Sequence, residues 1–206
     1  MNLVVGVDRA CSPLGLAALD YAGVWGLRVL PLLVGGDVPH FRSVSRGVLD
    51  ASSDPDTVRS WWRNAPKANV GVACAASGLV VLDIDSCARA IRTMARLVEA
   101  LGPLPQTWTA WTPGGSAQHF YRWEGPYREL REGLGLGVSI VHWSYVVAPP
   151  SCDSAHRRYS WRYRPGNVPL SPLPASWQER LSLSKHGRPR ALHRVLRTLA
   201  HVGGAS

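Results

Sequence analysis

Two aspartates stand one residue apart at the end of a continuous apolar run. Residues 78–85 read Gly-Leu-Val-Val-Leu-Asp-Ile-Asp, and such a run predicts a buried strand. Because side chains alternate faces along a strand, Asp83 and Asp85 are expected to point to the same side. Two like charges this close repel each other unless a cation lies between them, and Mg²⁺ takes such oxygen ligands. The pair therefore indicates either a divalent-metal site or two solvated aspartates at a strand end.

A glycine-rich turn introduces the second group of candidate residues. Residues 112–122 read Thr-Pro-Gly-Gly-Ser-Ala-Gln-His-Phe-Tyr-Arg, so the turn leads into a predicted strand that carries His119 and Arg122. Backbone N–H groups near Gly115 and Ser116 could approach a phosphate, and the histidine and arginine could add charge-assisted hydrogen bonds. The same pattern also suits an ordinary hairpin with a packed histidine.

The segment 157–164 alternates arginine with aromatic residues: Tyr159, Trp161 and Tyr163 share one predicted strand face, and Arg158 and Arg162 share the other. Such interleaving suits single-stranded nucleic acid, whose bases stack on rings and whose phosphates bind guanidinium groups. It equally describes an outer strand with its aromatic residues in the core and its arginines in solvent, and we favour this second interpretation.

The order of the predicted helices and strands indicates an α+β (mixed α/β) fold. Helices and strands alternate in the first part of the chain, and strands predominate in the later part. Serine or aspartate followed by proline marks two helix starts, at residues 12–13 and 53–56. The predicted helices are 13–25, 55–65 and 87–101, the last burying Ile91, Met94, Val98 and Leu101, and the Trp61–Trp62 pair is assigned to the core. The predicted strands are 27–33, 70–73, 78–84, 107–111, 119–123, 138–141, 145–148 and 158–163.

Domain organisation follows from length and composition. We expect one domain over residues 1–173 and a short, helical and basic tail over 174–206, which includes a basic run at 185–190 and a helical stretch around 192–199. A chain of 206 residues with 46% apolar and 18% charged residues is typical of a folded protein. The formal charge of +9, carried almost wholly by arginine, favours a polyanionic partner. Arginine usage can also reflect a GC-rich genome.

The four cysteines have no zinc-finger spacing, and Cys152 with His156 is the closest approach to a metal-binding pair, which alone is a weak signal. We expect reduced thiols in a soluble, cytoplasmic protein. The N-terminal residues lack the features of a secretory signal, and no apolar stretch is long enough to span a membrane.

Five ordered blocks carry a family resemblance. They are residues 47–56 (Gly-Val-Leu-Asp-Ala-Ser-Ser-Asp-Pro-Asp), 68–73 (Ala-Asn-Val-Gly-Val-Ala), 78–85, 114–121 (Gly-Gly-Ser-Ala-Gln-His-Phe-Tyr) and 145–151 (Tyr-Val-Val-Ala-Pro-Pro-Ser). Together they resemble the bifunctional DNA primase/polymerase (prim-pol) domain of the archaeo-eukaryotic primase superfamily, which is frequent in plasmids, phages and integrative elements. The resemblance covers about residues 20–173.

The resemblance implies a small α/β module packed on an RRM-like module, with the active site in the cleft between them. It implies that Asp83 and Asp85 bind two divalent metals, Mg²⁺ or Mn²⁺, and that His119 contacts the triphosphate of an incoming nucleotide, with Gly115, Ser116 and Arg122 as further nucleotide-binding residues. The implied activity is metal-dependent, template-directed DNA or RNA synthesis, by priming or primer extension, in replication of a mobile element. The implied partners are single-stranded DNA or a primer–template, nucleoside triphosphates, and a separate helicase or initiator.

Two departures from the family pattern leave other functions open. Ser139 stands where the family has a third acidic residue, and serine is a weaker metal ligand than a carboxylate. Glu124, Glu132 or Asp153 could replace that acid, whereas His142 would lie on the opposite strand face. The glycine turn is also one residue longer, which could misplace His119. The alternatives are therefore a degenerate, non-catalytic relative that binds DNA or nucleotide, and a metal-dependent phosphodiesterase.

Overall fold

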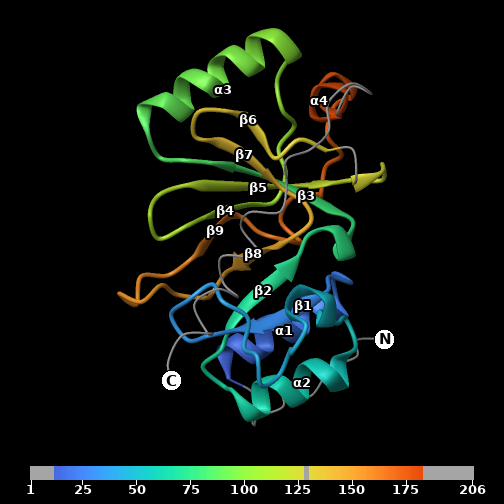
Figure 1. Cartoon of the computed structure of the whole chain (residues 1–206), viewed down its shortest axis with the longest axis vertical. Helices are drawn as coiled ribbons and strands as arrows, with labels where there is room; N and C mark the ends of the chain where they lie inside the picture. Colours follow the sequence, from blue (N-terminus) through green and yellow to red (C-terminus); the bar gives the residue numbers. More distant parts are fainter. Residues whose placement is uncertain (1–11, 128–129, 183–206) are drawn as a thin grey trace, which may run out of the picture.

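The structure is a computed structural model that describes residues 12–127 and 130–182 (Figure 1). The described residues form four α-helices, two short 3-10 helices and nine strands in two antiparallel sheets. The helices are α1 (Pro13–Gly23), α2 (Pro55–Asn64), α3 (Ala88–Leu101) and α4 (Ala175–Leu181), with η1 (Gly47–Asp50) and η2 (Ala75–Ser77). The strands are β1 (Val29–Leu32), β2 (Asn69–Ala73), β3 (Leu79–Ile84), β4 (Thr109–Trp111), β5 (Ala117–Arg122), β6 (Gly133–Gly135), β7 (Val138–Val141), β8 (Tyr145–Ala148) and β9 (Ser160–Tyr163).

The two sheets differ in size, and β3 belongs to the larger one. The smaller sheet has the order β1-β2-β8, and the larger has the order β6-β7-β3-β5-β4-β9. In the larger sheet β3 lies in the interior, with β7 on one side and β5 on the other. Helices α1 and α2 lie with the smaller sheet, whereas α3 lies at the opposite end of the molecule (Figure 1). The predicted α+β class is confirmed, and the strand aspartates lie in the larger sheet.

The starts of α1 and α2 are capped as the sequence predicts. The Oγ atom of Ser12 accepts a hydrogen bond from the N–H of Gly15 at 3.1 Å, and the Oδ2 atom of Asp54 accepts one from the N–H of Thr57 at 2.9 Å. Each capping side chain satisfies one of the N–H groups that a helix start leaves without an internal partner.

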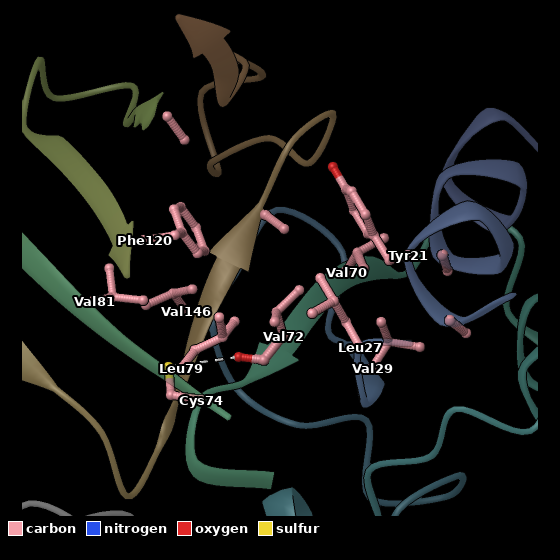
Figure 2. Close-up of a cluster of buried hydrophobic side chains, with 14 of the residues drawn as sticks. Tyr21, Leu27, Val29, Val70, Val72, Cys74, Leu79, Val81, Phe120 and Val146 are labelled. Carbon is pink, nitrogen blue, oxygen red and sulfur yellow. Dashed lines mark hydrogen bonds between the residues drawn. The ribbon is translucent and has the colours of Figure 1, made fainter. Parts of the chain in front are cut away.

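The main hydrophobic core lies between the two sheets. Val72 of the smaller sheet, Leu79 and Phe120 of the larger sheet, and Tyr21 of α1 converge there (Figure 2). Trp62 of α2 is fully buried in the same core, and its indole N–H donates to the carbonyl of Ala68 at 2.9 Å. The assignment of the tryptophan pair to the core is confirmed, with Trp61 half-buried beside it.

A second core lies between the larger sheet and helices α3 and α4. The predicted buried face of α3 was wrong for two residues, because Ile91 is 67% exposed and Val98 is 37% exposed. The buried residues are Ala90 and Leu97, with Met94 and Leu101 half-buried beside them. The small side chain of Ala90 lets the helix approach the sheet closely. The helix face in contact with the sheet is therefore the one that carries Ala90, and Ile91, the next residue, faces solvent.

Strand β9 is the edge strand of the larger sheet, as the favoured interpretation of segment 157–164 predicts. Tyr159, Trp161 and Tyr163 are half-buried, and the flanking arginines are exposed. Trp161 packs against Phe120 in the main core, with ring centroids 5.4 Å apart. Trp161 and Tyr159 therefore serve packing, whereas Tyr163 lies outside the core clusters and has the guanidinium of Arg162 5.4 Å from its ring.

The remaining sequence predictions have mixed outcomes. Strand β6 was missed, because residues 133–135 are Gly-Leu-Gly and carry no strand pattern. Helix α4 is present, and its Trp177 is fully buried in the second core. The basic run 185–190 and the helical stretch around 192–199 lie outside the described residues. None of the described helices has the length and apolarity needed to cross a membrane.

Candidate functional site

Antiparallel pairing aligns three polar side chains across the larger sheet. Asp83 of β3 is directly opposite Ser139 of β7 on one side and Gln118 of β5 on the other. Directly opposed residues share a face and have Cβ atoms about 5 Å apart. We call Ser139, Asp83 and Gln118 the β3 row. It lies on the face of the sheet that packs against the smaller sheet, because Leu79 and Val81 of the same face belong to the main core.

Asp85 extends this arrangement beyond the end of β3. Its N–H donates to the carbonyl of Gly137 at 2.9 Å, so pairing with the β7 side continues through this residue. Alternation along the strand then turns its side chain to the same side as that of Asp83. Asp83 is half-buried and Asp85 is exposed. The two carboxylates thus lie where the sheet emerges from its own core into solvent.

The glycine turn is the hairpin between β4 and β5, and it lies beside the end of β3. The hydroxyl of Ser86 donates to the carbonyl of Gly114 at 2.9 Å and joins the turn to the residue that follows Asp85. Gly115 has φ +86°, a conformation that favours glycine. Its N–H donates to the carbonyl of Thr112 at 2.9 Å, and the N–H of Ser116 donates to the hydroxyl of the same threonine at 3.1 Å. These two N–H groups are therefore used within the turn.

His119 lies on the other face of the larger sheet. It is opposite Leu82, which packs in the second core, and its Nδ1 atom lies 3.1 Å from the hydroxyl of Thr109. Burial lowers the pKa of His119, so its imidazole is neutral near pH 7. The structure does not bring this side chain to the β3 row, because His119 and Gln118 are adjacent in a strand and must point in opposite directions.

Arg122 is also separated from the row. It is opposite Leu79, four residues from the level of Asp83, which corresponds to about 13 Å along the strand. Its side chain is half exposed and lies 3.5 Å from a carboxylate oxygen of Glu124. Arg122 is therefore outside direct contact with a small ligand held at Asp83.

Glu124 and Glu132 do not supply the missing acid at the row. Ser139 fills the position opposite Asp83 and is exposed. Glu124 follows the end of β5 that is distant from Asp83. The carbonyl of Glu132 accepts a hydrogen bond from the N–H of Ile140, and the register of β6 and β7 places Glu132 on the face of the second core. These two glutamates are thus separated from the row by distance and by the sheet itself.

Asp153 is the acidic candidate that comes nearest to Asp83 in electrostatic terms. Burial raises the pKa of Tyr159, and the negative charges of Asp37, Asp153 and Asp83 raise it further. The negative charges of Asp153 and Asp83 therefore both act on the phenol of Tyr159. However, Asp153 is engaged by Arg157, whose guanidinium nitrogens lie 2.7 and 2.8 Å from its Oδ2 atom. Across residues 12–127 and 130–182, no group of three or more His, Cys, Asp or Glu residues is arranged to hold a metal ion.

Gln118 is the site residue that sequence reasoning missed. Its side chain is only 6% exposed, and its Oε1 atom has no hydrogen-bond partner among the described residues. Leaving a buried acceptor without a donor costs about 1–3 kcal/mol, so this amide is suited to a bound group. The extra residue in the glycine turn was the available signal, because one added residue reverses which β5 side chains face the row.

The comparisons with known proteins identify the family of the chain. No curated protein matches the chain. The family described as bifunctional DNA primase/polymerase, N-terminal, matches residues 18–176, which include both sheets and every residue of the β3 row. The chain therefore belongs to the Prim-Pol family of bifunctional DNA primase/polymerase domains.

Proposed function

We propose that this chain is a metal-dependent nucleotidyltransferase that extends or primes a nucleic-acid strand, with its site at Asp83 and Asp85. The observation that supports the proposal is the pairing of Asp83 with Ser139 and Gln118, together with the N–H of Asp85, two residues later, donating to the carbonyl of Gly137. Membership of a primase/polymerase family supports the reaction class. By the same resemblance, we propose that it acts in replication of a mobile element with a separate helicase or initiator.

The side chains at the site fit a hard divalent cation. Two carboxylates, the hydroxyl of Ser139 and the amide oxygen of Gln118 offer oxygen donors only, and Mg²⁺ commonly uses one or two carboxylates together with substrate phosphates. When bound there, Mg²⁺ or Mn²⁺ would lower the pKa of a 3′-hydroxyl and neutralise charge on the triphosphate.

The chain's own residues would position the reacting groups. Asp83, half-buried and fixed between two neighbouring strands, holds a negative charge at a defined place, and the exposed Asp85 presents a second one toward solvent. The Gln118 amide can accept a hydrogen bond through Oε1 and donate one through Nε2, so it can orient a nucleotide beside Asp83. The glycine turn next to Ser86 limits the site on the β5 side.

A primer-extension assay tests the proposal. We expect the wild-type chain to incorporate nucleotides on a primed template with Mg²⁺ or Mn²⁺, and the Asp83→Asn, Asp85→Asn double variant to lose this activity by at least about 100-fold. Asp56→Asn is a matched control, because Asp56 is an exposed aspartate in the first turn of α2. Equal activity of the double variant and the wild type would exclude these aspartates as the site.

A second candidate function is binding of nucleotide or DNA without synthesis. Two observations favour it: a neutral serine stands directly opposite Asp83, and His119 points to the other face of the sheet. The Ser139→Asp variant separates the two functions. Synthesis that appears only in this variant would establish the binding role for the natural chain, whereas strong synthesis by the wild type would exclude it.

A further inference from the structure

Helix α3 presents three arginines as one exposed stripe. Arg89, Arg92 and Arg96 are all exposed, and at 100° per residue they fall within an arc of about 60° around the helix. We call these three residues the α3 arginine stripe. It lies away from the buried residues Ala90 and Leu97, which attach the helix to the larger sheet. The stripe is therefore not needed for packing.

The arginines of the stripe have no acidic partner among the described residues. The salt bridges among the described residues involve Arg46, Arg59, Arg122 and Arg157. The single acidic residue of α3 is Glu99, one turn beyond Arg96. Arg46 and Arg157 are paired with neighbouring aspartates, whereas the exposed Arg63 and Arg158, like the stripe, have no ion pair among the described residues. The stripe consequently holds three uncompensated positive charges along one side of a helix.

The stripe begins close to Asp85 along the chain, on the face of the larger sheet opposite the β3 row. Helix α3 starts at Ala88, three residues after Asp85, and Arg89 is in its first turn. Seven residues separate Arg89 from Arg96, which is about 10 Å along the helix axis. One strand of a nucleic-acid duplex carries a phosphate about every 3.4 Å of axis, so the stripe spans about three phosphates.

We propose that the α3 arginine stripe binds the phosphate backbone of the nucleic-acid substrate outside the site, on the face of the larger sheet opposite Asp83. The identity of this polyanion rests on the proposed function. Planar guanidinium groups pair with phosphate oxygens through two parallel hydrogen bonds, and such contacts hold a strand without reading its sequence. The stripe positions the strand and takes no part in the chemistry.

An acidic protein is the competing partner, and the distribution of side chains on α3 argues against it. Protein interfaces generally combine charge with a contiguous apolar centre. The exposed apolar residues of α3, Ile91 and Val98, lie more than about 120° around the helix from the centre of the stripe. Beside the stripe lies the exposed Leu136, whose carbonyl accepts a hydrogen bond from the hydroxyl of Thr93 at 3.0 Å, which is one apolar side chain and not a contiguous apolar centre.

Salt-dependent binding of a labelled oligothymidylate strand tests the proposal. The assay uses the full chain in EDTA without nucleotide, so it does not depend on catalysis. Each phosphate contact contributes about −0.7 to the slope of log K against log salt for a single strand. We expect the Arg92→Gln, Arg96→Gln variant to have a slope less negative by about 1.4. The matched control is Arg63→Gln, Lys67→Gln, which removes the same charge from exposed positions at the α2 end of the molecule (Figure 1).

Three results would overturn the proposal. Equal slopes in the two double variants would mean that net charge alone governs binding. Absence of binding by the wild type at low salt would show that the chain does not bind a single-stranded nucleic acid. Arginine-dependent binding of polyglutamate without binding of the oligonucleotide would identify an acidic protein partner instead. Unchanged binding by the Asp83→Asn, Asp85→Asn variant would support the stripe even where synthesis fails, so the two proposals can fail separately.

Discussion

Gln118 and His119 are neighbours in sequence but lie on opposite faces of β5, with different consequences for a bound ligand. Gln118 is buried beside Asp83 and has an acceptor without a described partner. His119 contacts Thr109 on the face of the second core, and burial keeps it neutral. The amide therefore faces the β3 row, where we propose that a nucleotide binds, and the imidazole faces the second core.

We expect Gln118→Ala and His119→Ala to have opposite effects. Gln118→Ala should weaken binding of a Mn²⁺–nucleotide complex by about 5- to 30-fold, the equivalent of one hydrogen bond of about 1–2 kcal/mol, and should leave stability nearly unchanged. His119→Ala should leave binding unchanged and lower the free energy of unfolding. Calorimetric titration and urea unfolding of both variants measure the two effects. Loss of binding in His119→Ala alone would contradict this assignment.

The sequence predicts part of the site and misses the rest for a physical reason. The aspartate pair is visible because strand alternation is a local property, so Asp83 and Asp85 can be placed on one side without knowing their neighbours. The row is not visible, because the pairing of Asp83 with Ser139 and Gln118 depends on the lengths of two hairpins. A shift of the β3–β5 register by one residue would exchange the positions of Gln118 and His119.

At the scale of elements, the contact between α3 and the β6–β7 hairpin depends on a glycine. Gly137 has φ +74°, and a Cβ atom at this position would lie 2.8 Å from the Cβ atom of Ala90. We expect Gly137→Ala to lower the free energy of unfolding by about 2–4 kcal/mol, because it adds both backbone strain and a steric clash. Ile91→Ala is the control on the exposed side of the same helix and should change stability by less than about 0.5 kcal/mol. Urea unfolding compares them, and similar losses would contradict the observed orientation of α3.

The elements themselves were the most predictable part of the chain. Caps and prolines mark the starts of α1 and α2 locally, and these helices begin where the sequence indicates. The face that α3 buries was less predictable, because its apolar residues cover more than one side, and the choice between Ala90 and Ile91 depends on how closely the sheet approaches. That approach is a tertiary property set in part by Gly137.

At the scale of the whole molecule, Tyr21 links the smaller sheet to the larger one. Its hydroxyl donates to the carbonyl of Pro149, which follows β8, and accepts a hydrogen bond at 2.9 Å from the indole of Trp161 in β9. We expect Tyr21→Phe to lower the free energy of unfolding by about 2 kcal/mol or more, because both partners lose their bond inside the molecule. The hydroxyl of Tyr145 donates to the carbonyl of the exposed Asp37, so Tyr145→Phe should lower the free energy of unfolding by less than about 1 kcal/mol. Equal costs in urea unfolding would contradict the linking role.

The half-buried His119 and the buried His142 make the stability of the whole fold depend on pH. Burial lowers the pKa of His119 and also that of His142, for which the charge of Glu132 offsets part of the effect. In the unfolded chain both return to the ordinary value near 6.5 and bind protons more readily than in the folded protein. Stability should therefore be highest above about pH 7 and should fall as the pH decreases through 6.5 toward 5.

This histidine effect can be separated from that of the carboxylates. The pKa values of Asp50 and Asp54 are lowered, by hydrogen bonds from Arg46 and Thr57 respectively, so their contribution is lost only below about pH 4.5. We expect His119→Asn and His142→Asn each to reduce the change in melting temperature between pH 7 and pH 5. His156→Asn is the matched control, because His156 is exposed and its φ of +60° is one that asparagine tolerates. A control variant that flattened the pH profile as much as the other two would show that burial of histidine is not the cause.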